Sequence, residues 1–238
     1  MESFKILDLD SHLFGLLVAK ILPECLDVLQ LGELLFELKK KGVSLVYWCS
    51  KKEDIASQLA AGEYQGFLAD EKLTYVVNLL SIKDQLQDQD FQFYSELEPS
   101  ADLENLAFIS GQYSRFLKDP RIGLERFQKM YATWIRNSCN HRVAKAVLII
   151  NENKNLLGMA TLGEKESRGD IGLLAVSPQY YGRGIGTQLV RKAQAYFFNN
   201  KYAYAQVLTQ KDNIPACRLY EKCNFIIDSI QNFYHFWL

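Results

Sequence analysis

Hydrophobic and polar positions follow two different spacings in the first third of the chain. Two apolar runs, at 43–48 and 73–80, predict strands there. Two amphipathic segments, at 26–41 and 51–61, predict helices. This alternation is typical of a small α/β module. The stretch Ser81–Asp90 is the most polar in the chain, so we predict a boundary near it. The predicted domains are an N-terminal α/β module at 1–92 and a second domain at 93–238.

The second domain is predicted to be a mixed, mostly antiparallel sheet with helices, an α/β (α+β) fold. Ser100 is a plausible N-cap for a first helix, and apolar residues on one helical stripe mark another from 124 to 137. Further strands are predicted at 146–151, 156–162, 170–176 and 203–209. Further helices are predicted at 185–199 and 215–222. Because a helix joins the third of these strands to the fourth, a central β-α-β crossover is expected. Two short strands, 225–227 and 233–237, are predicted to close the sheet as a hairpin.

Composition excludes several classes of protein. The 238 residues carry a formal net charge of −1, which is unlike the basic balance of a nucleic-acid binder. The sequence contains neither an 18-residue apolar stretch nor a signal-peptide pattern, so we expect a cytoplasmic protein without a membrane span. Five scattered cysteines without a C-x-x-C pair indicate reduced thiols, and three histidines far apart in sequence give no metal-ligand spacing.

A glycine loop is the strongest chemical signal. A predicted strand ending at Val176 leads into glycines at every second position, Gly182, Gly184 and Gly186, and a helix follows at once. Glycines allow the backbone to approach a ligand closely, and the loop amides with the helix N-terminus form a site for a phosphate or pyrophosphate. The spacing matches neither a P-loop nor a dinucleotide fingerprint, because Thr187 follows the last glycine. A tight turn without a ligand is the alternative at this point.

The segment V-x-P-x-x-x-G-x-G-x-G from Val176 to Gly186 resembles the coenzyme A motif of GCN5-related N-acetyltransferases (GNAT). The resemblance implies the GNAT fold, with acetyl-CoA as cosubstrate. It implies that the strand before the loop offers its backbone to the pantetheine arm, and that the loop holds the pyrophosphate. The residues concerned are Leu174, Ala175 and Val176 on the strand and Tyr181, Gly182, Arg183, Gly184, Gly186 and Thr187 in the loop. Tyr181 departs from the Gln or Arg usual there, but the contacts are mostly made by backbone.

A second segment completes the resemblance. Asn213-x-x-Ala216-x-x-x-Tyr220, followed by Phe225, is similar to the GNAT pattern N-x-x-A-x-x-L-Y-x-x-x-G-F, with Asn224 in place of the glycine. In the family the asparagine contacts the coenzyme A arm and the tyrosine lies beside the thioester sulfur. The resemblance therefore implies that Tyr220 is the general acid that protonates the leaving thiolate. Without the resemblance, Tyr220 would be interpreted as a core tyrosine on the apolar helix face.

The acceptor is suggested by a narrower resemblance. The motifs L-D-S-x-x-F-G from Leu9, G-F-x-x-D-x-x-L-T-Y from Gly66, Y-S-R-F-x-x-D-P from Tyr113 and Y-x-x-W-I-x-N-S from Tyr131 occur in this order. With the acetyltransferase core, they resemble the dTDP-fucosamine (dTDP-4-amino-4,6-dideoxygalactose) acetyltransferase group. The resemblance implies N-acetylation of a nucleotide-linked amino sugar.

The third of these motifs offers groups suited to such an acceptor. Arg115 can pair with a phosphate, and Tyr113 or Phe116 can stack on a base or sugar. The alternative is that Arg115 and Asp119, four residues apart, pair with each other and fix a loop.

Several alternatives stay open at this stage. Four carboxylates are candidates for the general base: Asp70, Glu63, Glu164 and Glu166. The chain could instead acetylate another small-molecule or peptide amine, or bind acyl-CoA without turnover. The aromatic C-terminal run at 233–238 is either a buried strand, which we favour, or part of a homodimer face.

Overall fold

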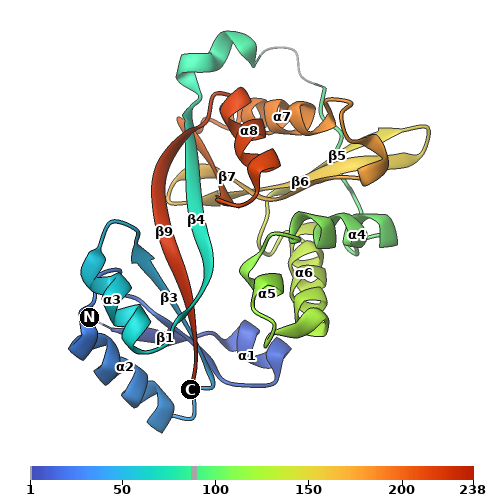
Figure 1. Cartoon of the computed structure of the whole chain (residues 1–238). Helices are drawn as coiled ribbons and strands as arrows, with labels where there is room; N and C mark the ends of the chain where they lie inside the picture. Colours follow the sequence, from blue (N-terminus) through green and yellow to red (C-terminus); the bar gives the residue numbers. More distant parts are fainter. Residues whose placement is uncertain (1, 87–89) are drawn as a thin grey trace.

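The protein is built on one nine-stranded mixed sheet, in the order β1-β2-β3-β9-β4-β8-β7-β6-β5 (Figure 1). The computed structural model describes residues 2–86 and 90–238, so residues 87–89 of the predicted boundary Ser81–Asp90 lie outside the described residues. The strands are β1 (Phe4–Ile6), β2 (Val18–Ile21), β3 (Leu45–Lys51), β4 (Phe67–Asn78), β5 (Ala146–Glu152), β6 (Asn155–Lys165), β7 (Arg168–Val176), β8 (Tyr204–Gln210) and β9 (Ile226–Trp237).

Helices cover both faces of the sheet. The α-helices are α1 (Asp8–Phe14), α2 (Val28–Lys40), α3 (Ile55–Glu63), α4 (Ala101–Ser110), α5 (Arg115–Lys118), α6 (Gly123–Cys139), α7 (Ile185–Asn199) and α8 (Ile214–Lys222), and two 3-10 turns are η1 (Leu80–Gln85) and η2 (Pro178–Tyr180). Buried residues of α7 and α8 pack with Leu73 and Tyr75 of β4, whereas those of α2 and α3 pack with Trp48 of β3. Buried residues of α1, α5 and α6 pack with Tyr47 and Phe233, which lie on the opposite face.

The predicted crossover is confirmed. β7 and β8 are parallel, with α7 between them in sequence. A second parallel pair, β2 and β3 joined by α2, lies at the other end of the sheet. The predicted cap of α4 is also present, because the Leu103 N–H donates a hydrogen bond to Ser100 Oγ at 3.3 Å. The elements β1, α1 and β2 were not predicted, since strands of three and four residues are too short to show a period.

The predicted closing hairpin is wrong. Residues 226–237 form one strand, β9, which runs the length of the molecule beside β4 (Figure 1). β4 pairs with β9 from Ile226 to His235, and β3 pairs with its last seven residues, from Gln231. The polar stretch in the middle of β9 is therefore held by hydrogen bonds instead of turning. The C-terminal aromatic run is therefore a largely buried strand.

The sheet joins the two parts of the sequence on either side of residue 92. β4 comes from the first part and lies between β8 and β9 of the second. The domain boundary at residue 92 stays a prediction, and the two predicted domains share the strands of one sheet. For the site, the consequence is that a strand from the N-terminal part runs next to the β7-α7-β8 crossover.

Candidate functional site

A cavity of about 680 Å³ opens where β7 and β8 separate. The two strands pair only over Gly169–Ile171 and Ala205–Val207, although both continue to Val176 and Gln210. Beyond Ile171 no described strand pairs with the edge of β7 that would face β8, so backbone N–H and C=O groups on that edge are available to a ligand. Residues of β7, β8, the glycine loop and α8 line one side of the cavity, and the segment between α4 and α5 lines the other.

The glycine loop has the backbone geometry that its sequence predicts. Gly182 and Gly184 both have φ of +78°, the left-handed region that side chains with a Cβ rarely adopt. Gly186 packs closely against α8, because a Cβ there would lie 3.2 Å from Leu219 Cδ2, which would have to shift slightly. α7 begins directly after Gly184, and among the described residues no side chain caps it. Its first N–H groups therefore face the cavity end without intrahelical partners, as an anion site requires.

The predicted strand and loop residues meet at the cavity, with one exception. Leu174, Ala175 and Val176 of β7 line it together with Tyr181, Gly182, Gly184, Gly186 and Thr187 of the loop. Arg183 does not line it. The Arg183 side chain forms an ion pair with Glu152 at 2.9 Å. The backbone N–H of Arg183 donates a hydrogen bond to the Tyr180 carbonyl at 3.4 Å. The Arg183 amide is thus already used within the turn.

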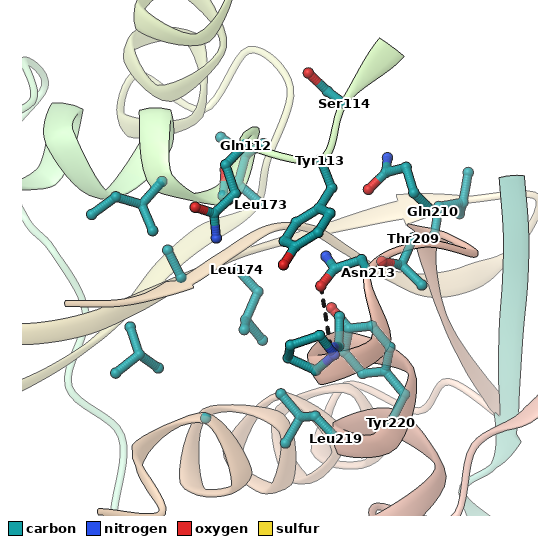
Figure 2. Close-up of a pocket in the computed structure, with 18 of the residues that line it drawn as sticks. Gln112, Tyr113, Ser114, Leu173, Leu174, Thr209, Gln210, Asn213, Leu219 and Tyr220 are labelled. Carbon is teal, nitrogen blue, oxygen red and sulfur yellow. Dashed lines mark hydrogen bonds between the residues drawn. The ribbon is translucent and has the colours of Figure 1, made fainter. Parts of the chain in front are cut away.

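α8 and its N-cap bring Tyr220 and Asn213 to the same cavity. Asn213 is the N-cap, since its Oδ1 accepts a hydrogen bond from the Ala216 N–H at 3.3 Å, shown as the dashed line in Figure 2. Tyr220 is 4% exposed, and burial raises its pKa, so its hydroxyl is protonated at neutral pH. Asn224 has φ of +69°, which explains why a glycine or an asparagine suits this position after the helix.

The opposite wall comes from the segment before and within α5. Tyr113 points toward Asn213 in Figure 2, and both residues line the cavity. Arg115 also lines it, with its guanidinium carbon 4.1, 4.4 and 4.9 Å from the ring centres of Phe116, Phe233 and Tyr47. Arg115 Nε is buried without a hydrogen-bond partner among the described residues. A cation held between rings with a free donor is suited to an anion.

Phe116 and Asp119 take other positions than those considered from the sequence. Phe116 is 1% exposed and packs in the core, so it is not brought to the cavity. The alternative pairing of Arg115 with Asp119 is wrong. Asp119 instead accepts hydrogen bonds from Trp237 Nε1 at 2.8 Å and from His235 Nδ1 at 2.9 Å. Burial acts to raise the pKa of Asp119, but these hydrogen bonds hold it below its usual range.

Of the four carboxylates considered as a base, only Asp70 lines the cavity. Glu63 is exposed at the end of α3, and Glu166 is exposed in the β6–β7 turn. Glu164 pairs with Lys145 at 2.6 Å, also outside the cavity. Burial raises the pKa of Asp70 to about 6, although the charges of Lys118 and Arg115 act against this.

Other residues of the cavity were not singled out from the sequence. Gln112, Trp134 and Gln210 line it, and Thr161 supports it from β6 by accepting a hydrogen bond from the Leu173 N–H at 2.8 Å. Trp134 was named only in an apolar helix stripe and in the Y-x-x-W-I-x-N-S motif, without a role in the site. Gln210 ends β8, Gln112 lies in a loop and Thr161 lies within β6, and nothing in the sequence distinguished them.

Two further observations concern the described residues as a whole. No group of three or more His, Cys, Asp or Glu side chains within them is arranged to hold a metal ion. None of their helices combines the length and the apolar character that crossing a membrane requires.

Comparison with known proteins identifies the fold. Residues 112–225 match the acetyltransferase (GNAT) family. A GCN5-related N-acetyltransferase from Sphaerobacter thermophilus superposes with a TM-score of 0.58 and 11% identity, over 98% of this chain and 75% of that one. A functionally unknown conserved protein from Staphylococcus epidermidis superposes with a TM-score of 0.61 and 14% identity, over 93% and 84%. These likenesses concern the fold alone.

Curated relatives match shorter stretches. The chain is 26% identical over 132 residues to the spore coat polysaccharide biosynthesis protein SpsD of Bacillus subtilis, covering 56% of this chain and 45% of that protein. It is 32% identical over 60 residues to a streptothricin acetyltransferase of Escherichia coli, covering 25% and 34%. The chain thus spans less than half the length of each of these two relatives.

Proposed function

We propose that this protein is an acetyl-CoA-dependent N-acetyltransferase whose acceptor is the amine of a nucleotide-linked amino sugar. The observation that carries the proposal is the cavity between the diverging ends of β7 and β8, with free backbone on one side and the N-terminus of α7 at its end. This is the arrangement that a long, phosphate-bearing thioester requires, and it lies in the part that matches the GNAT family.

The residues present fit acetyl-CoA. The amides of Gly184, Gly186 and Thr187 would hold the pyrophosphate, because the start of α7 offers donors and no side chain of the described residues caps it. The free edge of β7 from Leu174 to Val176 would pair with the pantetheine amides. Asn213 uses its Oδ1 as a cap, which leaves its Nδ2 to donate to the same arm.

Tyr220 supplies the acid chemistry in this proposal. Its hydroxyl is protonated at neutral pH because burial raises its pKa, so it can donate a proton to the departing sulfur. A backbone N–H on the free edge of β7 can stabilise negative charge on the carbonyl oxygen. The remaining acceleration comes from holding the acceptor amine close to the thioester carbonyl.

The charges of the cavity support an acceptor that carries both an anion and an amine. Arg115 and Lys72 are the cations among the described lining residues, and Asp70 is the acid. A nucleotide diphosphate would match Arg115, which lies between aromatic rings with Nε unpartnered. The similarity to a polysaccharide biosynthesis protein supports the same choice. An acceptor with several positive charges fits the cavity less well, because two cations and one acid are among the described residues that line it.

The test is acetyl-CoA binding by calorimetry, followed by thiol release with dTDP-4-amino-4,6-dideoxygalactose as acceptor. Binding with thiol release would support the proposal. Binding without release would leave a coenzyme site and reject this acceptor, and no binding would mean that the glycine loop is only a turn. A glycoside of the same amino sugar without the nucleotide separates the two halves of the acceptor. Equal kcat/KM for both acceptors would refute recognition of the nucleotide.

Two variants assign the roles. Tyr220→Phe should lower turnover sharply and leave acetyl-CoA binding nearly unchanged, whereas Tyr204→Phe, at an exposed tyrosine on β8, should change neither. Unaltered turnover in Tyr220→Phe would reject the acid assignment. Arg115→Lys keeps the charge but loses the fork of donors, so it should raise KM for the nucleotide-linked acceptor and not for the simple glycoside.

A further inference from the structure

A bulge in β4 turns one carboxylate into the cavity. Leu68 pairs with Tyr234 of β9, and continued pairing would place Ala69 opposite Phe233. Instead Asp70 pairs with Phe233, so Ala69 is an extra residue. A shift of one residue moves every following side chain to the other face of the sheet. Asp70 therefore lies on the face of Phe233 and Arg115, whereas a regular strand would direct it to the face of α2 and α3.

The Asp70 carboxylate is buried and incompletely satisfied. The residue is 5% exposed, and its Oδ1 has no hydrogen-bond partner among the described residues. A buried carboxylate without partners is costly, so such a group in a cavity indicates that a ligand supplies the missing donor. The two nearby cations also interact with other groups: Lys118 forms an ion pair with Asp212, and Arg115 stacks on aromatic rings.

We propose that Asp70 binds the acceptor ammonium and takes its proton before acetyl transfer, an inference that rests on the proposed function. An amine with its proton has no lone pair for attack, and among the described residues Asp70 is the one acid that lines the cavity. An ammonium is also the donor that Oδ1 lacks.

The proposed step balances as follows in atoms and charges. Asp70 Oδ1 takes one proton from the ammonium, which leaves a neutral amine and a neutral carboxyl group. The nitrogen lone pair forms the C–N bond to the acetyl carbon, the C–S bond breaks, and the sulfur takes the proton of the Tyr220 hydroxyl. The tyrosinate recovers the second proton of the nitrogen, and Asp70 releases its proton to solvent. The products are the amide, the free thiol and one proton.

The surroundings suit a base at neutral pH. Burial raises the pKa of Asp70 to about 6, and the cations Lys118, Arg115 and Lys72 act in the opposite direction. Tyr131 of α6 also faces it, and the Asp70 charge adds to the burial that raises the pKa of this phenol. Asp70 is thus ionised above about pH 6, close enough to neutrality to take and release a proton.

The experiment compares Asp70→Asn, Asp70→Glu and Glu63→Gln, the last removing an exposed carboxylate outside the cavity. Asp70→Asn should lower kcat/KM at pH 7 by about 10²- to 10⁴-fold. Acetyl-CoA binding by calorimetry should be unchanged. The loss should shrink as the pH rises toward the pKa of the acceptor amine, because free amine then needs no base. Asp70→Glu should recover part of the activity, and Glu63→Gln should match the wild type.

The outcomes separate the two proposals. If the wild type transfers acetyl and Asp70→Asn is equally active, with the same acid limb in its pH profile, Asp70 is not the base and the proposed function stands. A loss in Asp70→Asn that is constant across pH would indicate a structural defect and also reject the inference. A wild type that binds acetyl-CoA and transfers nothing overturns both. Should Asp70→Asn fail to fold, a shifted acid limb in Asp70→Glu supports the inference and an unshifted limb rejects it.

Discussion

Thr161 holds an irregular stretch of β7 beside the cavity, so its replacement tests how the site is supported. Ala160 pairs with Leu174 and Leu162 with Ile171, which leaves two residues of β7 opposite Thr161 alone. In that stretch the Leu173 N–H donates to Thr161 Oγ1 at 2.8 Å, and Thr161 is 4% exposed.

Thr161→Val replaces the acceptor by a methyl group of nearly the same size. The partly buried Leu173 N–H would then lose its partner, which costs about 1–3 kcal/mol where water does not replace the partner. Thr161→Ser keeps the acceptor and loses one methyl group, worth about 0.8 kcal/mol. The valine variant should therefore be the less stable of the two, although it is the more hydrophobic.

The assay is urea unfolding of both variants, followed by thiol release under saturating acetyl-CoA. We expect Thr161→Val to lower kcat on the order of 10²-fold, because the adjacent backbone of β7 would hold the thioester out of position. Thr161→Ser should retain most of the activity. A valine variant as stable as the wild type, or a serine variant less stable than the valine one, would refute the role given to this hydrogen bond.

Three further predictions follow from the same geometry. Gly184→Val should abolish acetyl-CoA binding, because Gly184 has φ of +78°; unaltered affinity in calorimetry would reject the loop assignment. Burial lowers the pKa of His235 to about 4, below its unfolded value of about 6.5, so the folded state binds fewer protons between these values. Asp70, whose pKa is raised to about 6, acts in the opposite sense over the same range. In the Asp70→Asn background, which removes this opposing effect, the free energy of unfolding should thus fall as the pH drops from 6.5 to 4, and equal urea midpoints at pH 7 and 4.5 would contradict this. Arg183→Ala removes an exposed ion pair, so it should change the free energy of unfolding by less than about 1 kcal/mol, which thermal melting checks. The affinity for acetyl-CoA, measured by calorimetry, should change little.

The parts of the site that the sequence predicted are those in which neighbouring residues act together. The glycine loop and α8 are contiguous segments: the glycine spacing predicted a tight turn before a helix N-terminus, and the resemblance to the GNAT motifs assigned the site residues of both. Their residues meet at the cavity with the exception of Arg183, whose amide closes the turn and whose side chain pairs with Glu152.

The parts that the sequence did not predict depend on pairing between distant strands. The polar middle of β9 resembles a turn when taken alone, and it stays extended because β3 and β4 hold it from both sides. Arg115 and Asp119 have the spacing of a helical ion pair. α5 nevertheless has four residues, and Asp119 is recruited by His235 and Trp237, more than a hundred residues away. The spacing of residues within one segment gives no information about hydrogen-bond partners that are distant in the sequence.

Three departures from regular pairing meet at the cavity: the end of β7–β8 pairing after Ile171, the register shift opposite Thr161, and the bulge at Ala69. Each one frees backbone or turns a side chain into a space that a regular sheet would close. The first two lie within residues 112–225, the part that matches the GNAT family, and they shape the wall proposed for acetyl-CoA. The third lies on β4, outside the matched part, and it presents Asp70 to the acceptor end. The wall proposed for acetyl-CoA therefore lies in the part that matches the family, whereas the proposed proton acceptor depends on a strand that the N-terminal part inserts into the sheet. Exchanging β4 residues should accordingly change acceptor turnover without changing coenzyme affinity.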